Sequence, residues 1–232
     1  MTDLESSHYL TPRFQAVKDD IAKACLDIGR NPNSAHLLAV SKKHSIASIQ
    51  QVYKLGQRAF GENYVQEGVD KVLALNDLDI EWHFIGPIQS NKSKLVAENF
   101  DWVHTIDRTK IAIRLNEQRP ENTANLNVLI QVNISQEESK SGVTLTDIDK
   151  LADTIHKLDK LTLRGLMCIP AKQDAETLKK EFKLMQNAYA QLQKQYPNID
   201  TLSMGMSGDL SDAITCGSTL VRIGTAIFGQ RL

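Results

Sequence analysis

Short runs of apolar residues alternate with amphipathic stretches along most of the chain. The runs are rich in Val, Ile, Leu and Phe, and the stretches repeat their apolar positions with helical period. An opening helix is predicted over 10–29, with further helical material such as 46–55, 64–75 and 175–195 between the runs. Eight runs have strand length: 36–41, 58–61, 82–86, 102–106, 128–134, 163–169, 201–206 and 220–223.

Strands that are apolar on both faces are typical of parallel sheets covered by helices. Eight strand–helix units are the number that closes a barrel, and 232 residues lies within the barrel size range. The competing fold is an open doubly wound sheet, whose GxGxxG fingerprint should follow the first strand. That strand runs into SKKHS instead. We therefore predict one α/β domain over residues 1–232, a (β/α)8 TIM-type barrel with an extra N-terminal helix.

Composition removes several classes of protein. The 41% hydrophobic and 24% charged content is that of an ordinary globular protein, and a formal net charge of -1 argues against nucleic acid as the main partner. No apolar stretch approaches the roughly 20 residues of a membrane-spanning helix, and the first residues carry no signal-peptide core. Cys25, Cys168 and Cys216 form no CxxC, so we expect buried reduced thiols, no metal and a cytoplasmic location.

Barrels carry their chemistry at the C-terminal ends of the strands and commonly bind phosphate after strands seven and eight. Ser207-Gly208 follows the seventh strand and Gly224-Thr225 the eighth, and both supply backbone N–H groups and a hydroxyl. Ser207 could instead cap a helix over 209–216, and Asp209 suits a phosphate only if its carboxylate points away. The two loops together predict an anion site.

Lys42 ends the first strand, which puts its stem in the mouth of the barrel. Partial desolvation there lowers the pKa of a lysine and frees its neutral amine to attack an aldehyde. Side chains alternate along a strand, so Lys43 should point toward the helix layer if Lys42 points inward. Lys140 lies in the charged loop QEESKSG and should be solvated. An ordinary solvated loop lysine is the alternative reading of Lys42.

Arg222 is a charged residue inside the apolar strand LVRIG. Its burial is costly unless the guanidinium is paired or bonds a ligand. A structural ion pair is one interpretation. Because a phosphate site and a lysine are predicted at the same mouth, contact with an aromatic cofactor is the better interpretation. A barrel without ligand should then leave the guanidinium short of hydrogen-bond partners.

The segments LLAVSK, FGENYVQEGVDK, EWHFIGPIQSNK, LNVLIQVNIS, KSG, LRGLM, SMGMS and VRIGTAIFG resemble the pyridoxal phosphate homeostasis proteins. That family is similar to the barrel domain of alanine racemase, a fold-type III pyridoxal 5'-phosphate (PLP) enzyme. The resemblance runs from Leu37 to Gly229 in the expected order. One departure is Gly208, where the family pattern has a bulkier polar residue after the serine.

The resemblance implies PLP as the cofactor and assigns residues to it. Lys42 would be the Schiff-base lysine and Asn63 would line the cofactor near its ring. Arg222 would donate to the pyridine nitrogen. Ser207, Gly224 and Thr225 would hold the phosphate.

The resemblance and the residues agree on the function. Racemisation needs two acid/bases on opposite faces of the substrate, and the tyrosine that alanine racemase takes from a second domain is not expected in this chain. An arginine can only donate, so it keeps the ring nitrogen unprotonated and weakens the ring as an electron sink. We expect a monomer that holds PLP for intracellular homeostasis and buffers it or delivers it to apo PLP-dependent enzymes. It should have no racemase activity and no nucleic-acid or membrane partner.

Two alternatives stay open. One is a single-domain PLP-dependent amino-acid racemase or lyase that uses His83 or Tyr64 as its second base, although His83 sits mid-strand, where a hydrogen-bonded core histidine is expected. The other is a phosphosugar isomerase with the same phosphate loops, and such a protein would be colourless rather than yellow.

Overall fold

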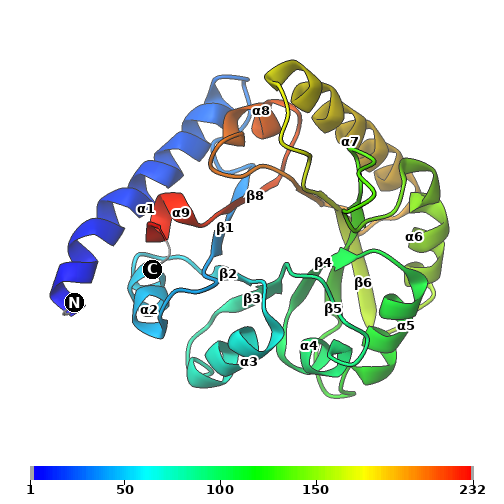
Figure 1. Cartoon of the computed structure of the whole chain (residues 1–232), viewed down its shortest axis with the longest axis horizontal. Coiled ribbons are helices and arrows are strands. Elements are labelled where there is room, and N and C mark those ends of the chain that lie inside the picture. The colour runs from blue at the N-terminus through cyan, green and yellow to red at the C-terminus, as the bar shows by residue number, and fades with distance from the viewer. Residues whose placement is uncertain (1–2, 231–232) are drawn as a thin grey trace.

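The computed structural model describes residues 3–230 and shows a closed barrel of eight parallel strands, each paired with the next in chain order and β8 with β1 (Figure 1). The predicted barrel is confirmed, with every predicted strand present. The strands are β1 (His36–Val40), β2 (Ala59–Glu62), β3 (Glu81–Phe84), β4 (Trp102–Ile106), β5 (Leu126–Val132), β6 (Leu161–Cys168), β7 (Thr201–Ser203) and β8 (Leu220–Ile223).

Helices form a layer around the strands, as Figure 1 shows. They bury apolar faces with helical spacing against the outside of the barrel, which is the packing that the amphipathic stretches predict. They are α1 (Asp3–Leu26), α2 (Ile46–Lys54), α3 (Val65–Ala74), α4 (Ser93–Asn99), α5 (Thr109–Gln118), the 3-10 turn η1 (Leu145–Asp147), α6 (Ile148–His156), α7 (Ala175–Gln195), α8 (Leu210–Thr215) and α9 (Thr225–Phe228).

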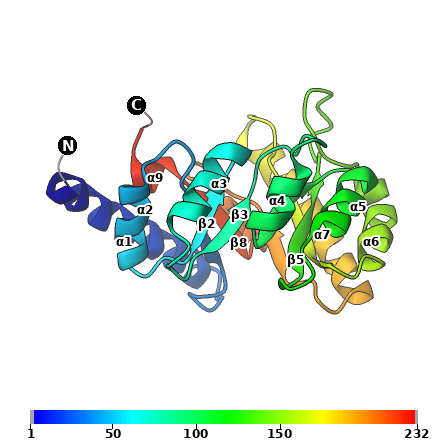
Figure 2. The same ribbon diagram turned by 90° about the horizontal axis from the view of Figure 1, so that it is seen from below.

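The extra helix α1 packs against α2, α8 and α9, beside the strands where the barrel closes (Figures 1 and 2). Phe14, Val17 and Ile21 bury its apolar face. The predicted extent, 10–29, was wrong at the C-terminal end of this helix. The helix stops at Leu26, and Ile28 is 39% exposed in the turn that Gly29 completes with a left-handed φ of 72°.

The register of the strands decides which loops meet at the mouth. Ala39 of β1 pairs with Ile223 of β8, and Val40 pairs with Gly61 of β2. Arg222 N donates to Gly205 O at 3.0 Å, which sets β8 beside the end of β7. The segments after β7, β8, β1 and β2 therefore form one continuous arc at the C-terminal end of the barrel.

Other predictions concern the whole fold. The three cysteines are free and buried, as predicted. In the described part of the chain, no cluster of side chains could ligate a metal ion. None of the helices over residues 3–230 has the length and apolar character that crossing a membrane requires.

Candidate functional site

Lys42 lies two residues beyond the end of β1 and is half-buried. Hydrogen bonds fix the backbone on both sides of it. The carbonyl of Ser41 accepts from Lys71 Nζ at 2.8 Å, and the backbone N–H of Lys43 donates to Glu67 Oε1 at 2.5 Å. Lys42 is thus carried on an anchored loop rather than on a mobile one.

Lys43 is exposed, and its Nζ lies 5.6 Å from the centre of the Tyr64 ring. Lys43 thus points outward as predicted, but strand alternation is not the cause. β1 ends at Val40, so strand alternation does not reach residue 43. A left-handed φ of 62° at Lys43 redirects the chain instead.

Sequence reasoning missed a buried ionic cluster behind this loop. Glu62 is fully buried, and its Oε1 accepts from Ser41 Oγ at 2.6 Å and from Lys71 Nζ at 2.9 Å. Lys71 Nζ also donates to Glu67 Oε1 at 2.7 Å. The signal was present in GENYVQEGVDK, which puts a carboxylate at the end of an apolar strand and an i,i+4 acid–base pair on the next helix.

The electrostatics of Glu62 reflect its burial. Desolvation raises its pKa above the ordinary value, while the charge of Lys71 and the hydrogen bonds from Ser41 and Lys71 pull it back. Among the described residues, its second oxygen, Oε2, has no hydrogen-bond partner. The Glu62 carboxyl group therefore binds a proton more readily than an ordinary glutamate, and it contacts Ser41, the residue before Lys42.

Arg222 is 5% exposed and extends toward the ends of β6 and β7. Its NH1 donates to Ser203 Oγ at 2.7 Å and its NH2 to Cys168 O at 2.8 Å. The expectation that the guanidinium would be short of partners is only partly right, because neighbouring strand ends supply acceptors for two of its five N–H groups. Both acceptors are uncharged, and within residues 3–230 no ion pair to Arg222 is present, against the structural ion-pair interpretation.

Two N–H groups of five are used in these bonds, so Arg222 keeps donor capacity for a ligand. Burial lowers the pKa of Arg222, while Cys168 and Asp209 act in the opposite direction. The thiol of Cys168 stays protonated and uncharged at neutral pH, because burial raises its pKa to about 12.

The two predicted phosphate loops lie side by side after β7 and β8. The alternative interpretation of Ser207 as a helix cap does not hold, because Asp209 occupies the N-cap position of α8. The Asp209 carboxylate turns back to accept from Met206 N at 2.5 Å, which leaves the exposed Ser207 outside that cap. Gly224 is the N-cap residue of α9 and Thr225 its exposed first residue.

The glycines of these loops have different surroundings. A Cβ on Gly224 would lie 3.1 Å from Val40 O, so this backbone abuts the end of β1 below Lys42. A Cβ on Gly208 would meet no atom within 4 Å. The bulkier residue of the family pattern would therefore find open space at this position. A cavity of about 380 Å³ lies beside Ser207 and Gly208, with α1 on its other side.

Asn63 follows β2 directly and is half-buried. Its backbone carbonyl packs against Gly86, where a Cβ would come within 2.0 Å of Asn63 O. By the β1–β2 register, Asn63 stands next to Lys42 on one side of the mouth, while Gly224 and Thr225 stand on the other.

The remaining candidates lie elsewhere. His83 is in β3, bonded to Glu81 at 2.8 Å and to His104 at 2.9 Å, so it is a hydrogen-bonded core histidine as the sequence favoured. Tyr64 is exposed beneath Lys43. Lys140 is half-buried and pairs with Glu137 at 2.8 Å, so the prediction of a solvated Lys140 was only partly right.

The sequence matches known proteins over most of its length. Residues 16–232 match the family model of the alanine racemase N-terminal domain. A protein of Vibrio alginolyticus named pyridoxal phosphate homeostasis protein is 61% identical over 208 residues, covering 88% of this chain and 89% of the relative. The protein of the same name from Escherichia coli K12 is 55% identical over 219 residues, covering 93% and 94%. The chain belongs to the pyridoxal phosphate homeostasis protein family.

A solved structure is consistent with this membership. PipY of Synechococcus elongatus PCC7942, in a structure described as having PLP bound, is 36% identical and superposes with a TM-score of 0.77. The match covers 90% of this chain and all of PipY. The resemblance to the pyridoxal phosphate homeostasis protein family, inferred from the motifs, is confirmed.

Proposed function

We propose that this protein binds PLP at the barrel mouth, held on Lys42 as a Schiff base, and that it buffers the cofactor or delivers it to other proteins. The observation that carries this proposal is the position of Lys42, half-buried on a loop anchored on both sides. It stands in one arc of strand ends with Asn63, Gly224 and Thr225. The names of the relatives and the PLP-bound PipY structure support it.

The residues present fit the three polar features of PLP, which are an aldehyde, a pyridine nitrogen and a phosphate. The neutral amine of Lys42 would add to the aldehyde carbon, and water would leave as the C=N bond forms. Arg222 would donate to the ring nitrogen with an N–H that the bonds to Ser203 and Cys168 do not use. Ser207, Gly224 and Thr225 would bond the phosphate from two adjacent loops.

The same geometry favours holding the cofactor over reacting it. Bound PLP supplies an electron sink for carbanion chemistry, and a ring nitrogen that only accepts from arginine is a weak sink. A second acid/base is also needed for racemisation. His83, the in-barrel candidate, is committed to Glu81 and His104 within the barrel.

Borohydride labelling tests the proposal. Purified protein should be yellow, and reduction should fix PLP on the peptide that contains Lys42, because only this lysine is half-buried in the arc of phosphate and ring donors. Mass spectrometry of the digest is the measurement. Lys43→Ala is the matched control and should label like the wild type, since Lys43 is exposed over Tyr64. Label found chiefly on Lys43 or Lys140 would refute the assignment.

A further inference from the structure

A row of polar side chains crosses the interior of the barrel from Arg222 to Glu81. Arg222 NH1 lies 2.7 Å from Ser203 Oγ, and Ser203 Oγ lies 3.2 Å from His104 Nδ1. His104 Nε2 is 2.9 Å from His83 Nδ1, and His83 Nε2 is 2.8 Å from Glu81 Oε1. The four residues from Arg222 to His83 are buried, whereas the side chain of Glu81 is 48% exposed.

The donors in this row all point the same way. Arg222 can only donate, so Ser203 Oγ accepts from it and has its own hydrogen available for His104 Nδ1. His104 is neutral, because burial, with the charge of Arg222 acting in the same direction, holds its pKa well below the ordinary value. A neutral imidazole that accepts at Nδ1 carries its hydrogen on Nε2 and donates to His83 Nδ1.

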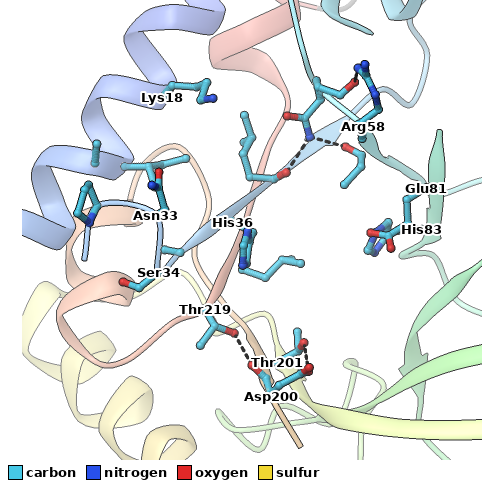
Figure 3. Close-up of a pocket in the computed structure, with 18 of the residues that line it drawn as sticks. Lys18, Asn33, Ser34, His36, Arg58, Glu81, His83, Asp200, Thr201 and Thr219 are labelled. Atoms are coloured by element: carbon cyan, nitrogen blue, oxygen red, sulfur yellow. Dashed lines mark hydrogen bonds and ion pairs between the residues drawn. The ribbon is translucent and has the colours of Figure 1, made fainter. Parts of the chain in front are cut away.

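The row ends on a carboxylate at the opposite face of the barrel from Lys42. Burial opposes ionisation of Glu81, but the hydrogen bond from His83 lowers its pKa below the ordinary value. Glu81 and His83 form one wall of a cavity of about 700 Å³ at the N-terminal ends of the strands, with Asp200 and Thr201 on another wall (Figure 3). The row thus ends on a carboxylate at the end remote from the mouth, in a cavity that Lys18, Arg58 and Arg164 also line.

We propose that Ser203 and His104 are positioning residues for Arg222, and that the row from Ser203 to Glu81 sets both the direction and the effective charge of the guanidinium that faces the cofactor ring. The inference rests on the proposed function and deepens it. A buried guanidinium without an ion pair needs compensation, and aligned hydrogen bonds that end on a carboxylate polarise one another and supply it.

The tautomer of His104 is the decisive feature. With its hydrogen on Nδ1, His104 would donate to Ser203 Oγ alongside Arg222, so both lone pairs of the oxygen would be used. The hydroxyl hydrogen of Ser203 would then need another acceptor. With its hydrogen on Nε2, His104 leaves Ser203 free to accept from Arg222, so the guanidinium stays directed toward β7.

Glu81→Gln is the sharpest test, because it keeps the size of a half-exposed side chain far from the mouth and removes only the terminal charge. We expect PLP affinity to fall about threefold and the pH midpoint of the visible PLP band to move to lower pH. The direction follows because a less compensated guanidinium disfavours a proton on the Lys42 imine. Asp200→Asn is the matched control, since Asp200 lines the same cavity but bonds Arg164 and Thr201 instead.

Ser203→Ala removes the link itself and should weaken PLP binding about tenfold, equal to about 1.4 kcal/mol. Thermal melts of the PLP-free proteins show whether each variant is folded. Unchanged PLP affinity and pH midpoint in folded Glu81→Gln and Ser203→Ala would overturn the inference, while absence of any borohydride label in the wild type would instead overturn the proposed function.

A measurement without PLP tests the inference independently. In the ¹⁵N NMR spectrum of the PLP-free protein, His104 should be protonated on Nε2 and bare on Nδ1 through neutral pH. Ser203→Ala should change this tautomer distribution, and His156→Phe, at an exposed helix position outside the row, should not. A hydrogen found on Nδ1 of His104 in the wild type would contradict the proposed direction.

Discussion

A single buried ammonium, that of Lys71, controls the backbone that carries Lys42. Its Nζ donates to Ser41 O, Glu62 Oε1 and Glu67 Oε1 at 2.7–2.9 Å. An ammonium has three donors, so this geometry satisfies it completely. Removing the ammonium would leave the Glu62 carboxylate buried without a counter-charge, which is costly in a protein interior.

Lys71→Met should lower the free energy of unfolding at neutral pH by about 3 kcal/mol, measured by denaturant titration. The loss should shrink at acid pH. Glu62 has a raised folded-state pKa, so protonation favours the folded state below the unfolded pKa, and this contribution is lost as pH rises through the folded pKa. Lys94→Met is the matched control, since the Lys94 side chain is 67% exposed, and should change stability by less than about 0.5 kcal/mol. Equal losses in the two variants would contradict the role of Lys71.

At the scale of elements, the loops that follow adjacent strands position one another through backbone packing and hydrogen bonds. Gly86, after β3, packs on the carbonyl of Asn63, after β2, and its own carbonyl accepts from Thr105 Oγ1 of β4 at 2.7 Å. The position of Asn63 beside Lys42 therefore depends on the absence of a side chain at residue 86.

Gly86→Ala should displace the Asn63 loop, because its Cβ would lie 2.0 Å from a backbone oxygen that has little freedom to move. We expect a stability loss of about 1–3 kcal/mol and PLP binding at least about tenfold weaker. Thermal melts and absorbance titrations with PLP measure both. Gly208→Ala is the control with open space around its Cβ and should match the wild type in stability. Normal binding by Gly86→Ala would show that Asn63 is not held in this way.

The loops after β7 and β8 should supply a large share of the PLP affinity. Ser207, Gly224 and Thr225 offer several donors to one anion, and hydrogen bonds to charged groups are worth about 1.5–3 kcal/mol each. Pyridoxal, which lacks the phosphate, should therefore bind at least about 100-fold more weakly in a parallel titration. Comparable affinities for the two aldehydes would contradict a phosphate site at these loops.

At the scale of the whole molecule, the two ends of the barrel carry different chemistry. The mouth has the amine of Lys42 and the donors of the phosphate loops. The opposite end has the Glu81–His83 pair in a cavity of about 700 Å³. The histidine that could have served as a second base is thus placed at the end away from the proposed cofactor site.

This separation predicts that the PLP-loaded protein does not exchange the α-hydrogen of alanine at an enzymatic rate. The assay is deuterium incorporation from solvent, with Lys42→Ala as the control for uncatalysed exchange. Exchange at about 1 per second or faster, lost in Lys42→Ala, would place the protein among the enzymes.

The sequence by itself determined the barrel, its eight strands and the loops that carry the candidate residues. These follow from periodicity and from residue types next to strand ends, which are local properties of the chain. Lys42 and Thr225 could therefore be placed at the mouth from the local sequence, and Asn63 was added by the family resemblance. Arg222 was recognised in the same way, as a charge inside an apolar strand.

Only the tertiary structure decided what these residues bond. The acceptors of Arg222 come from β6 and β7, and the Glu62–Lys71 pair joins a strand to the next helix. The row from Ser203 to Glu81 links β7, β4 and β3. Its hydrogen bond between Ser203 and His104 joins residues that are 99 positions apart in the sequence. Such contacts depend on strand register and on the closure of the barrel. No local pattern encodes either one, because each strand would be equally apolar in another register.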